Sequence, residues 1–314
     1  MATIFTRTTT PEARKYLEDR GHTLIEKNTR DVAEILSLAK DCDAILGNVT
    51  AKGDDFFSAL PSLKILALYS AGFDSIDLAA AERAGVYVTN CGGGNSLAVA
   101  EHTMGLMNAA SKLYKMRQHV FTEGNWDHAG RHVDGFELSG KTLLIVGVGH
   151  IGKTTAKIAA LGYDMRVLGY HPRATQKDLP PYITPVEDLH AAIKQADVVS
   201  MHIPMSVENK HFFGKEEIAL MKPTSIFVNT ARGGVVDEKA LIDALKEGRI
   251  WGAGLDVFEE EPIVDFTNPL FHMDNVFITP HVGGSREATE RTRLIAAEQI
   301  DLVLSGKEPT LNVY

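Results

Sequence analysis

Three side chains that could perform acid–base chemistry follow three successive apolar runs in the second half of the chain. Arg232 follows the run 225–230, carboxylates at 259–261 follow the run 252–257, and His281 follows the run 276–280. A guanidinium binds carboxylate and carbonyl oxygens, and an imidazole donates or accepts a proton. If the runs are parallel strands of one sheet, these groups meet at one edge. Taken singly, Arg232 is more often a surface ion pair, the carboxylates a solvated acidic turn, and His281 a capping or packing residue. Their places after successive runs favour a shared site.

A glycine motif precedes these groups. The apolar run 142–146 ends in Gly147, Gly149 and Gly152, spaced G-x-G-x-x-G, and a helix-forming segment follows. This pattern predicts a strand–turn–helix whose backbone N–H groups bind a pyrophosphate. Residues 147–154 also read G-x-x-x-x-G-K-T, the phosphate loop of ATP- and GTP-hydrolysing enzymes, and a glycine turn without a ligand is a third interpretation. No acidic residue closes the runs 198–203 or 225–230 to hold magnesium, which favours the dinucleotide interpretation.

Apolar runs alternate with helical patterns along most of the chain, which predicts an α/β fold with parallel sheets. The first part has strand candidates at 4–5, 23–25, 44–46, 65–68 and 86–88, with helices at about 11–19, 31–39, 54–59 and 77–84. A glycine run at 91–95 suits a hinge, and one long helix is expected at about 96–121. Six strands follow at 142–147, 165–170, 197–202, 225–230, 252–257 and 276–280, with a final helix at about 285–305.

Composition excludes several other classes. The 314 residues are 44% hydrophobic and 23% charged, with a formal net charge of −9. No basic stripe indicates nucleic-acid binding, and no run is long enough to span a bilayer. Cys42 and Cys91 form neither a disulfide framework nor a metal-ligand spacing, so we expect no metal. The N-terminus lacks the apolar region of a signal peptide, so we expect a cytoplasmic protein.

Taken together, the motifs resemble the D-isomer-specific 2-hydroxyacid dehydrogenases over nearly the whole chain. The matching segments are 70–77, 100–102, the glycine motif, 229–237, 255–258 with 261–262, and 279–281. The resemblance implies an NAD(P)-dependent oxidoreductase with two Rossmann-like doubly wound domains. Residues 1–97 plus 285–314 would form a discontinuous substrate domain and 98–284 the cofactor domain, with a catalytic cleft between them. The long helix and the loop after it would form the interface of a homodimer.

The resemblance also implies the roles of individual residues. Arg232 would bind the substrate carboxylate and carbonyl oxygen, His281 would transfer the proton, and Glu261 would keep that proton on the imidazole near neutral pH. The implied cofactor-binding residues are Gly147, Gly149, His150, Ile151, Gly152, His171, Pro172, Arg173, His202, Pro204, Thr230, Ala231, Arg232, Asp256, His281 and Gly283. The implied substrate-binding residues are Ser70, Ala71, Gly72, Arg232 and His281.

The sequence departs from the family at the position that selects the cofactor. About 20 residues past the glycines, where an acidic residue is expected, the sequence has His171, followed by Pro172 and Arg173. Without a carboxylate, a 2′-phosphate is no longer repelled and a nearby arginine could accommodate it. We therefore hypothesise NADPH use or dual use. In the alternative, His171 hydrogen-bonds the ribose and the enzyme prefers NADH.

The substrate stays open at this level. The segment 93–96 resembles phosphoglycerate dehydrogenases, yet the loop 47–50 has no arginine where those enzymes have one. Glyoxylate, hydroxypyruvate or another small 2-oxo acid is at least as plausible. One alternative of another class is a non-catalytic corepressor-like protein that senses the dinucleotide and binds protein partners. The phosphate-loop hydrolase is the less favoured alternative.

Overall fold

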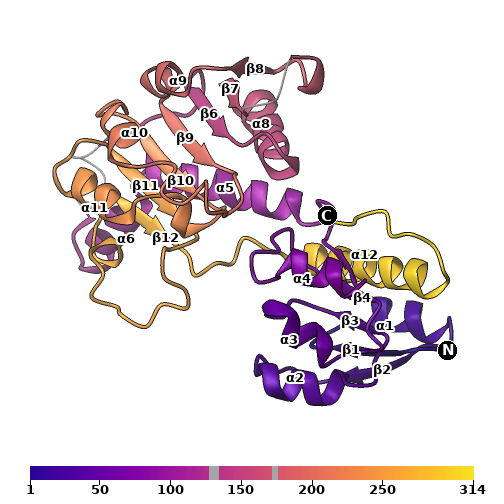
Figure 1. Cartoon of the computed structure of the whole chain (residues 1–314). Helices are drawn as coiled ribbons and strands as arrows, with labels where there is room; N and C mark the ends of the chain where they lie inside the picture. The colour runs from indigo at the N-terminus through magenta and orange to yellow at the C-terminus, as the bar shows by residue number, and fades with distance from the viewer. Residues whose placement is uncertain (127–133, 172–175) are drawn as a thin grey trace. The chain divides into compact units, whose positions relative to one another are not determined.

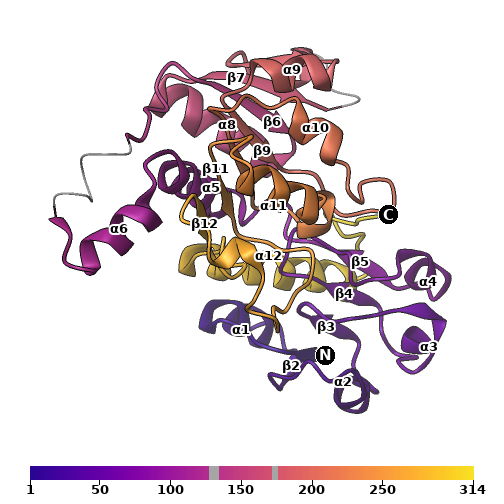
Figure 2. The same cartoon turned by 90° about the vertical axis from the view of Figure 1, so that its left-hand side faces the viewer.

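The computed structural model describes residues 1–126, 134–171 and 176–314, and the chain folds into two compact units (Figure 1, Figure 2). Unit 1 consists of Met1–Asn95 and Gly284–Tyr314, and unit 2 of Ser96–Gly283. Each unit is a parallel sheet with helices on its faces, which confirms the predicted fold class. Which unit binds substrate and which binds cofactor stays a prediction. Among the helices of the described residues, none is long and apolar enough to cross a membrane.

Unit 1 is built on a five-stranded parallel sheet with the strand order β2-β1-β3-β4-β5. The chain places β2 on one side of β1 and then β3, β4 and β5 on the other side. The strand order therefore switches between β1 and β3. The strands are β1 (Thr3–Thr6), β2 (Thr23–Glu26), β3 (Ala44–Leu46), β4 (Ile65–Ala67) and β5 (Tyr87–Thr89).

Helices cover both faces of this sheet. The pair α1 (Pro11–Glu18) and α12 (Arg286–Leu304) packs on one face, where residues such as Ile4, Leu17 and Ile300 are fully buried. On the other face, α2 (Val32–Ala39), α3 (Gly53–Ser58) and α4 (Leu78–Arg83) bury a second cluster around Phe5, Ile45 and Leu66. Alternate residues of one strand thus face opposite cores, as the period of a strand requires.

Unit 2 contains a seven-stranded parallel sheet with the order β12-β11-β10-β9-β6-β7-β8. Apart from the added β12, this is the strand order of a dinucleotide-binding fold, with its switch point between β6 and β9. The strands are β6 (Thr142–Val146), β7 (Arg166–Tyr170), β8 (Ile183–Val186), β9 (Val198–Met201), β10 (Ile226–Asn229), β11 (Gly252–Leu255) and β12 (Val276–Ile278).

The helices of unit 2 form two layers around the sheet. On one face lie α5 (Ser96–Ser111) and α8 (His150–Tyr163), and on the other lie α9 (Leu189–Gln195), α10 (Lys215–Ala219) and α11 (Glu238–Lys246). Helix α6 (Tyr114–Thr122) has no buried residue and extends away from the sheet of its unit in Figure 2. The described residues of the unit also form the short 3-10 helices η1 (Gln176–Asp178), η2 (Gly233–Val235) and η3 (Pro269–Phe271).

Two sequence expectations about unit 2 are wrong. The single helix expected at 96–121 is two helices, because Leu113 adopts a left-handed conformation with φ 54° between α5 and α6. Leu113 is 5% exposed, so burial of its side chain stabilises a break that no glycine or proline marks. The expected six-stranded sheet has a seventh strand, β8, which contains Pro185. Proline is tolerated there because β8 is an edge strand and pairs only with β7.

Candidate active site

The strands of unit 2 end together at one edge of the sheet. Their last residues form one paired row, in which neighbouring strands match end to end. The row is Tyr170, Val146, Met201, Asn229, Leu255 and Ile278. Each group that the sequence singled out in this unit comes within six residues of this row, and parallel sheets bind ligands outside such ends. The register of the sheet therefore gathers residues spread over more than a hundred positions.

The glycine motif forms the expected strand–turn–helix, in which β6 is followed by α8. At each of its three positions, the surroundings explain why the residue is glycine. Gly147 has φ +103°, and a Cβ there would lie 2.6 Å from the carbonyl oxygen of His202. A Cβ on Gly152 would lie 2.1 Å from the oxygen of Gly147, so only glycine lets α8 pack so closely. At Gly149 a Cβ would meet nothing within 4 Å. That open space before the helix N-terminus fits a pyrophosphate, since a protein contact does not explain it.

Two further predicted cofactor segments border this turn. His150 and Ile151 open α8, with His150 exposed and Ile151 half-buried. His202 follows β9 and donates its backbone N–H to the oxygen of Val146 at 2.7 Å, while Pro204 beyond it is exposed. Removal of the ring from water lowers the pKa of His202 to about 3, and its Nε2 lies 2.9 Å from Ser200 Oγ. The lowered pKa favours the neutral ring of His202, which can form hydrogen bonds.

The residue predicted to select the cofactor lies at the end of β7. His171 is exposed and follows the β7 strand directly, at the same edge of the sheet as the glycine turn. No carboxylate occupies this position. Pro172 and Arg173 lie outside the residues that the structure describes.

Arg232 is held by a turn at the end of β10. The side chain of Asn229, 2% exposed, accepts from the N–H of Ala231 at 3.0 Å and donates to the oxygen of Arg232 at 2.9 Å. The predicted cofactor residue Thr230 is buried, and its hydroxyl lies 2.9 Å from that of Thr103 on α5. The turn is thus fixed from two sides, and the guanidinium of Arg232 donates from Nη1 to the oxygen of Ala231 at 2.7 Å.

The loop after β11 presses against this turn. A Cβ on Gly233 would lie 1.8 Å from the carbonyl carbon of Phe258, so the two backbones touch where only glycine fits. Beyond Phe258 the loop turns back, because Glu261 Oε1 accepts from the Phe258 N–H at 2.9 Å. This approach brings the Glu261 carboxylate into the electrostatic field of Arg232.

Glu261 and His281 form an acid–base pair. His281 Nδ1 lies 2.7 Å from Glu261 Oε2, and the two side chains are 51% and 32% exposed. The hydrogen bond from Glu261 outweighs burial and raises the pKa of His281 above its ordinary value. For Glu261, burial raises the pKa, but the bonds from His281 and the Phe258 N–H outweigh it and leave that pKa lowered. With Nδ1 engaged, Nε2 of His281 is the nitrogen that can exchange a proton with a ligand.

Asp256 shapes the loop that carries His281, a function that the sequence did not reveal. His281 has the left-handed φ of 55° and donates its N–H to the Asp256 oxygen at 2.8 Å. The next two N–H groups, of Val282 and Gly283, donate to the Asp256 carboxylate at 2.9 Å each. These bonds fix the strained backbone at His281. The predicted role of Asp256 in binding nicotinamide stays a prediction.

His102 and Thr279 complete this buried network and were missed as site residues. The Thr279 hydroxyl donates to Asp256 Oδ1 at 2.6 Å, and His102 Nε2 lies 3.2 Å from the same oxygen and 2.9 Å from Thr279 Oγ1. Burial raises the pKa of Asp256, which is 2% exposed, but these hydrogen bonds outweigh it and the pKa is lowered. The motifs 100–102 and 279–281 were the only signals, because nothing in the sequence places α5 beneath β11 and β12.

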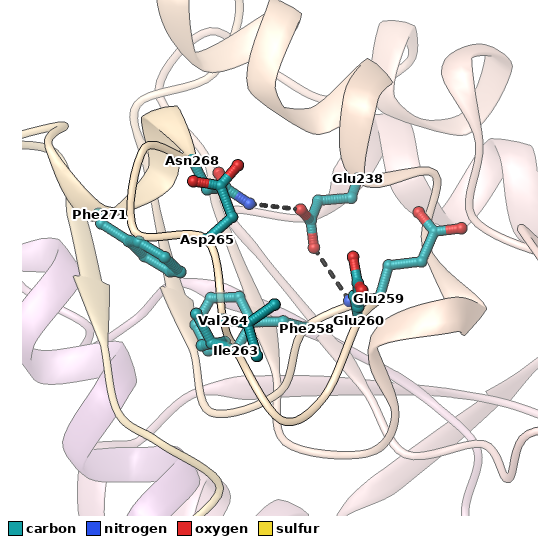
Figure 3. A pocket seen from close by; sticks show the side chains of 9 residues that line it. All are labelled: Glu238, Phe258, Glu259, Glu260, Ile263, Val264, Asp265, Asn268 and Phe271. Atoms are coloured by element: carbon teal, nitrogen blue, oxygen red, sulfur yellow. Dashed lines mark hydrogen bonds between the residues drawn. The ribbon is translucent and has the colours of Figure 1, made fainter.

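A pocket of about 250 Å³ lies beside the Glu261 loop (Figure 3). Its lining is Glu238, Phe258, Glu259, Glu260, Ile263, Val264, Asp265, Asn268 and Phe271. Four of these are carboxylates, so the pocket suits neither a pyrophosphate nor an anionic acid. Figure 3 shows the Glu238 carboxylate bonded to the Glu259 N–H, at 3.0 Å, and to Asn268 Nδ2, at 2.7 Å. Glu238 thereby holds both ends of the loop in place.

The remaining predicted substrate residues belong to unit 1. Ser70, Ala71 and Gly72 are half-buried and form the turn after β4, where Ser70 Oγ donates to the Gly72 oxygen at 2.7 Å. Asn90 Nδ2 donates to the oxygen of Ala71 at 3.1 Å and ties this turn to the end of β5. The turn lies at the carboxyl edge of its own sheet, and its role with substrate stays a prediction.

The family model that matches is that of the D-isomer specific 2-hydroxyacid dehydrogenase NAD-binding domain, over residues 103–283. Those residues coincide closely with unit 2, which contains the glycine turn, Arg232, Glu261 and His281.

Curated relatives and solved structures agree with this match. A D-3-phosphoglycerate dehydrogenase of Methanocaldococcus jannaschii is 39% identical over 94% of this chain, which spans 56% of that relative's length. A glyoxylate reductase of Thermofilum pendens is 39% identical over 88% of this chain and 82% of its own. The crystal structure of a glyoxylate reductase from Paecilomyes thermophila superimposes with a TM-score of 0.89 at 26% identity, covering 99% of this chain and 98% of that one.

Proposed function

Because this chain belongs to the D-isomer-specific 2-hydroxyacid dehydrogenase family and is therefore an NAD(P)-dependent oxidoreductase of 2-oxo acids, we propose that it reduces glyoxylate, hydroxypyruvate or a similar small acid to the D-2-hydroxy acid. The phosphoglycerate couple is the second candidate. The observation that supports this most directly is the 2.7 Å pair of His281 with Glu261 in the field of Arg232. It joins a proton donor, whose pKa is raised by its carboxylate partner, to a cation for an anionic substrate.

The roles of the three residues follow from their chemistry. The guanidinium of Arg232 binds the carboxylate and the carbonyl oxygen of the acid and draws electron density from the carbonyl carbon. The protonated His281 gives its Nε2 proton to the carbonyl oxygen and takes it back in the oxidative direction. Glu261 holds Nδ1–H, which orients the ring and stabilises the imidazolium. Ser70, Ala71 and Gly72 are proposed to add backbone N–H groups to the carboxylate.

The glycine turn and the neighbouring strand ends are proposed to hold the dinucleotide. Bound there, it supplies the hydride. The turn at Gly147 and the open space at Gly149 receive the pyrophosphate, and the neutral His202 borders the same edge. Thr230, Ala231, Asp256 and Gly283 lie at the ends of the following strands.

The first test combines a substrate panel with two site variants. We expect oxidation of NADPH or NADH with at least one of glyoxylate, hydroxypyruvate, pyruvate and phosphohydroxypyruvate. His281→Ala should lower kcat by roughly 10²- to 10⁴-fold, and Arg232→Ala should abolish turnover. Both variants should still bind the cofactor, which is measured by the quenching of their tryptophan fluorescence. His190→Ala, which breaks a comparable 3.0 Å histidine–glutamate pair with Glu217, is the matched control. Near-normal turnover in His281→Ala would contradict the proton-donor role.

We also propose that the enzyme uses NADPH, alone or beside NADH. The support is the lack of a carboxylate after β7, where His171 stands. A carboxylate there would accept the ribose hydroxyls and repel a 2′-phosphate. His171→Asp should therefore lower kcat/KM for NADPH relative to NADH, and Lys177→Asp, a charge change in the following 3-10 helix η1, controls for general electrostatics. A strong NADH preference in the unaltered enzyme would refute this proposal.

A homodimer is proposed from the surface of α6. This helix has no buried residue, and Tyr114 and Phe121 are 51% and 53% exposed, with Trp126 beyond the helix at 76%. Exposed aromatic side chains in one segment are typical of an interface. Phe121→Glu should shift the mass measured by light scattering from dimer to monomer, whereas Val207→Glu, at a 91% exposed position in the same unit, should not. A monomeric unaltered protein would refute the proposal.

A further inference from the structure

Arg293 on α12 carries a charge that no carboxylate of the described residues neutralises by an ion pair. It is half-buried, and its guanidinium lies over the ring of Tyr69, 4.4 Å from the centroid. Nη2 donates to Thr8 Oγ1 at 3.1 Å and Nη1 to the oxygen of Thr289 at 3.4 Å. A guanidinium has five N–H groups, so three of them have no acceptor among the described residues. Burial lowers the pKa of Arg293 and outweighs the opposing effect of the Glu26 carboxylate, which forms its own ion pair with Arg14. An arginine nevertheless stays charged at physiological pH.

This guanidinium lies at the carboxyl edge of the sheet in unit 1. Its partner Thr8 is two residues past the end of β1, and Tyr69 is two residues past the end of β4. The last residues of β1, β3 and β4 pair in one row: Thr6 with Leu46, and Leu46 with Ala67. The contacts of Arg293 therefore reach the same edge from two strands.

The position in the fold is one where α/β sheets bind ligands. The order β2-β1-β3-β4-β5 switches between β1 and β3, and ligands bind outside the strand ends at such a switch. The loops after these two strands contact each other, because Arg7 Nη1 donates to the oxygen of Asn48 at 2.9 Å. Arg293 thus reaches, through Thr8, one of the two strands that flank the switch point.

The same edge has a second positive charge and a polar atom without a partner. Arg7 donates to the backbone oxygens of Thr29 and Asn48 and to Asn28, and it also lacks an ion pair among the residues described. The buried Oδ1 of Asn48 has no hydrogen-bond partner within the described part of the chain. Rotation of this amide by half a turn presents its N–H groups instead. Two cations and an amide at a switch point form a set that an anion would satisfy.

We propose that this edge is a subsite for a second anionic group of the substrate, a phosphoryl or carboxylate group on the carbon beyond the 2-oxo group. Arg293 binds that group with its three remaining N–H groups, Thr8 holds the guanidinium, and Arg7 adds positive potential. Ser70, which follows Tyr69 directly, begins the turn proposed to hold the 2-oxo acid's own carboxylate. The inference rests on the proposed function and adds to it a preference, among small 2-oxo acids, for those with two anionic groups.

The test compares substrates that differ only in the second charge. Phosphohydroxypyruvate against hydroxypyruvate isolates a phosphoryl group, and oxaloacetate against pyruvate isolates a carboxylate. For the unaltered full-length enzyme we expect kcat/KM to favour one anionic acid over its neutral counterpart, and the pair that shows it identifies the group. Arg293→Gln should reduce that ratio by roughly 10- to 150-fold, the range for a charge-assisted hydrogen bond. Arg293→Lys should retain part of the preference.

Two controls separate ligand binding from a packing role. Arg291→Gln makes the same change two residues earlier on α12, where the side chain donates to the oxygen of Gly94, and should leave the ratio unchanged. In Arg293→Gln, kcat/KM for glyoxylate should stay within about threefold. An equal loss for every substrate would mean that Arg293 only packs on Tyr69, and an unchanged ratio would also overturn the proposal. If the unaltered enzyme turns over no acid at all, the proposed function fails instead.

Discussion

The pair His281–Glu261 makes a prediction about pH that can be worked through from the structure. Glu261→Gln keeps the shape of the side chain and an acceptor oxygen, but removes the negative charge that raises the pKa of His281. A hydrogen bond to a charged partner is worth about 1 kcal/mol more than a neutral one. Because the two side chains are 51% and 32% exposed, water screens their charges and the difference in hydrogen-bond free energy does not exceed about 1 kcal/mol. This corresponds to a loss of up to roughly fivefold in kcat/KM for reduction, reached at pH values above the pKa of His281.

The sign of the pH dependence follows from the direction of the pKa shift. Reduction requires the protonated imidazole, so it is lost as pH rises through the pKa of His281. In Glu261→Gln that pKa falls, so the loss begins at lower pH and the gap between the two enzymes widens toward alkaline pH. Below the ordinary pKa of histidine both rings are protonated and the gap narrows. Oxidation of the D-2-hydroxy acid requires the neutral ring, so there the variant should retain activity to lower pH.

The assay is kcat/KM against pH in both directions, with the best acid of the panel. Glu260→Gln is the matched control, since it removes a neighbouring exposed carboxylate that has no bond to His281. The reasoning is refuted if the profiles of Glu261→Gln and the unaltered enzyme are parallel, or if Glu260→Gln shifts the profile equally.

Three substitutions test the framework around the site. Gly152→Ala should abolish cofactor binding and lower the melting temperature, because its Cβ would overlap the Gly147 oxygen at 2.1 Å; fluorescence titration and thermal unfolding measure both. Gly105→Ala, in the middle of α5 with nothing within 4 Å, should instead raise the free energy of unfolding by about 0.5–1 kcal/mol, measured with urea. Asp256→Asn places an N–H group against the donors that fix the loop of His281, and should cost about 2–4 kcal/mol in urea unfolding and most of kcat. An unaltered urea midpoint in Asp256→Asn would contradict the assigned network.

The sequence revealed the strands and the catalytic residues because both have local signals. Short β-branched runs between helical patterns located the strands of both sheets except one, and the strand ends located Arg232 and His281. The parallel register then brings these residues to one edge, which requires no knowledge of side-chain packing. The missed strand, β8, contains Pro185, and its pattern is too weak to distinguish from a loop.

Features that depend on tertiary contacts could not be predicted in this way. The break at Leu113 is stabilised by burial of its own side chain, so the helical pattern runs through it unchanged. The network of Asp256 with His102 joins positions 154 residues apart through the packing of α5 on the sheet. Arg293 meets Thr8 across 285 residues, and in the sequence it is one of several charged residues of an amphipathic helix. Its lack of an ion pair among the described residues is visible only in three dimensions.

The order of segments along the chain has a consequence for synthesis. Unit 2 is one continuous stretch, so all its strand pairs can form before residue 284 leaves the ribosome. Unit 1 cannot be completed then, because α12 covers one face of its sheet and packs on α1, and Val313 donates its N–H to the oxygen of Val88 at 3.0 Å. One face of β1, β3 and β4 is covered by α12, and the opposite face is covered by α2. Until α12 emerges, the first of these faces stays exposed. The strands β1, β3 and β4 are thus made long before the helix that covers this face, and the nascent chain exposes an apolar sheet face until α12 emerges.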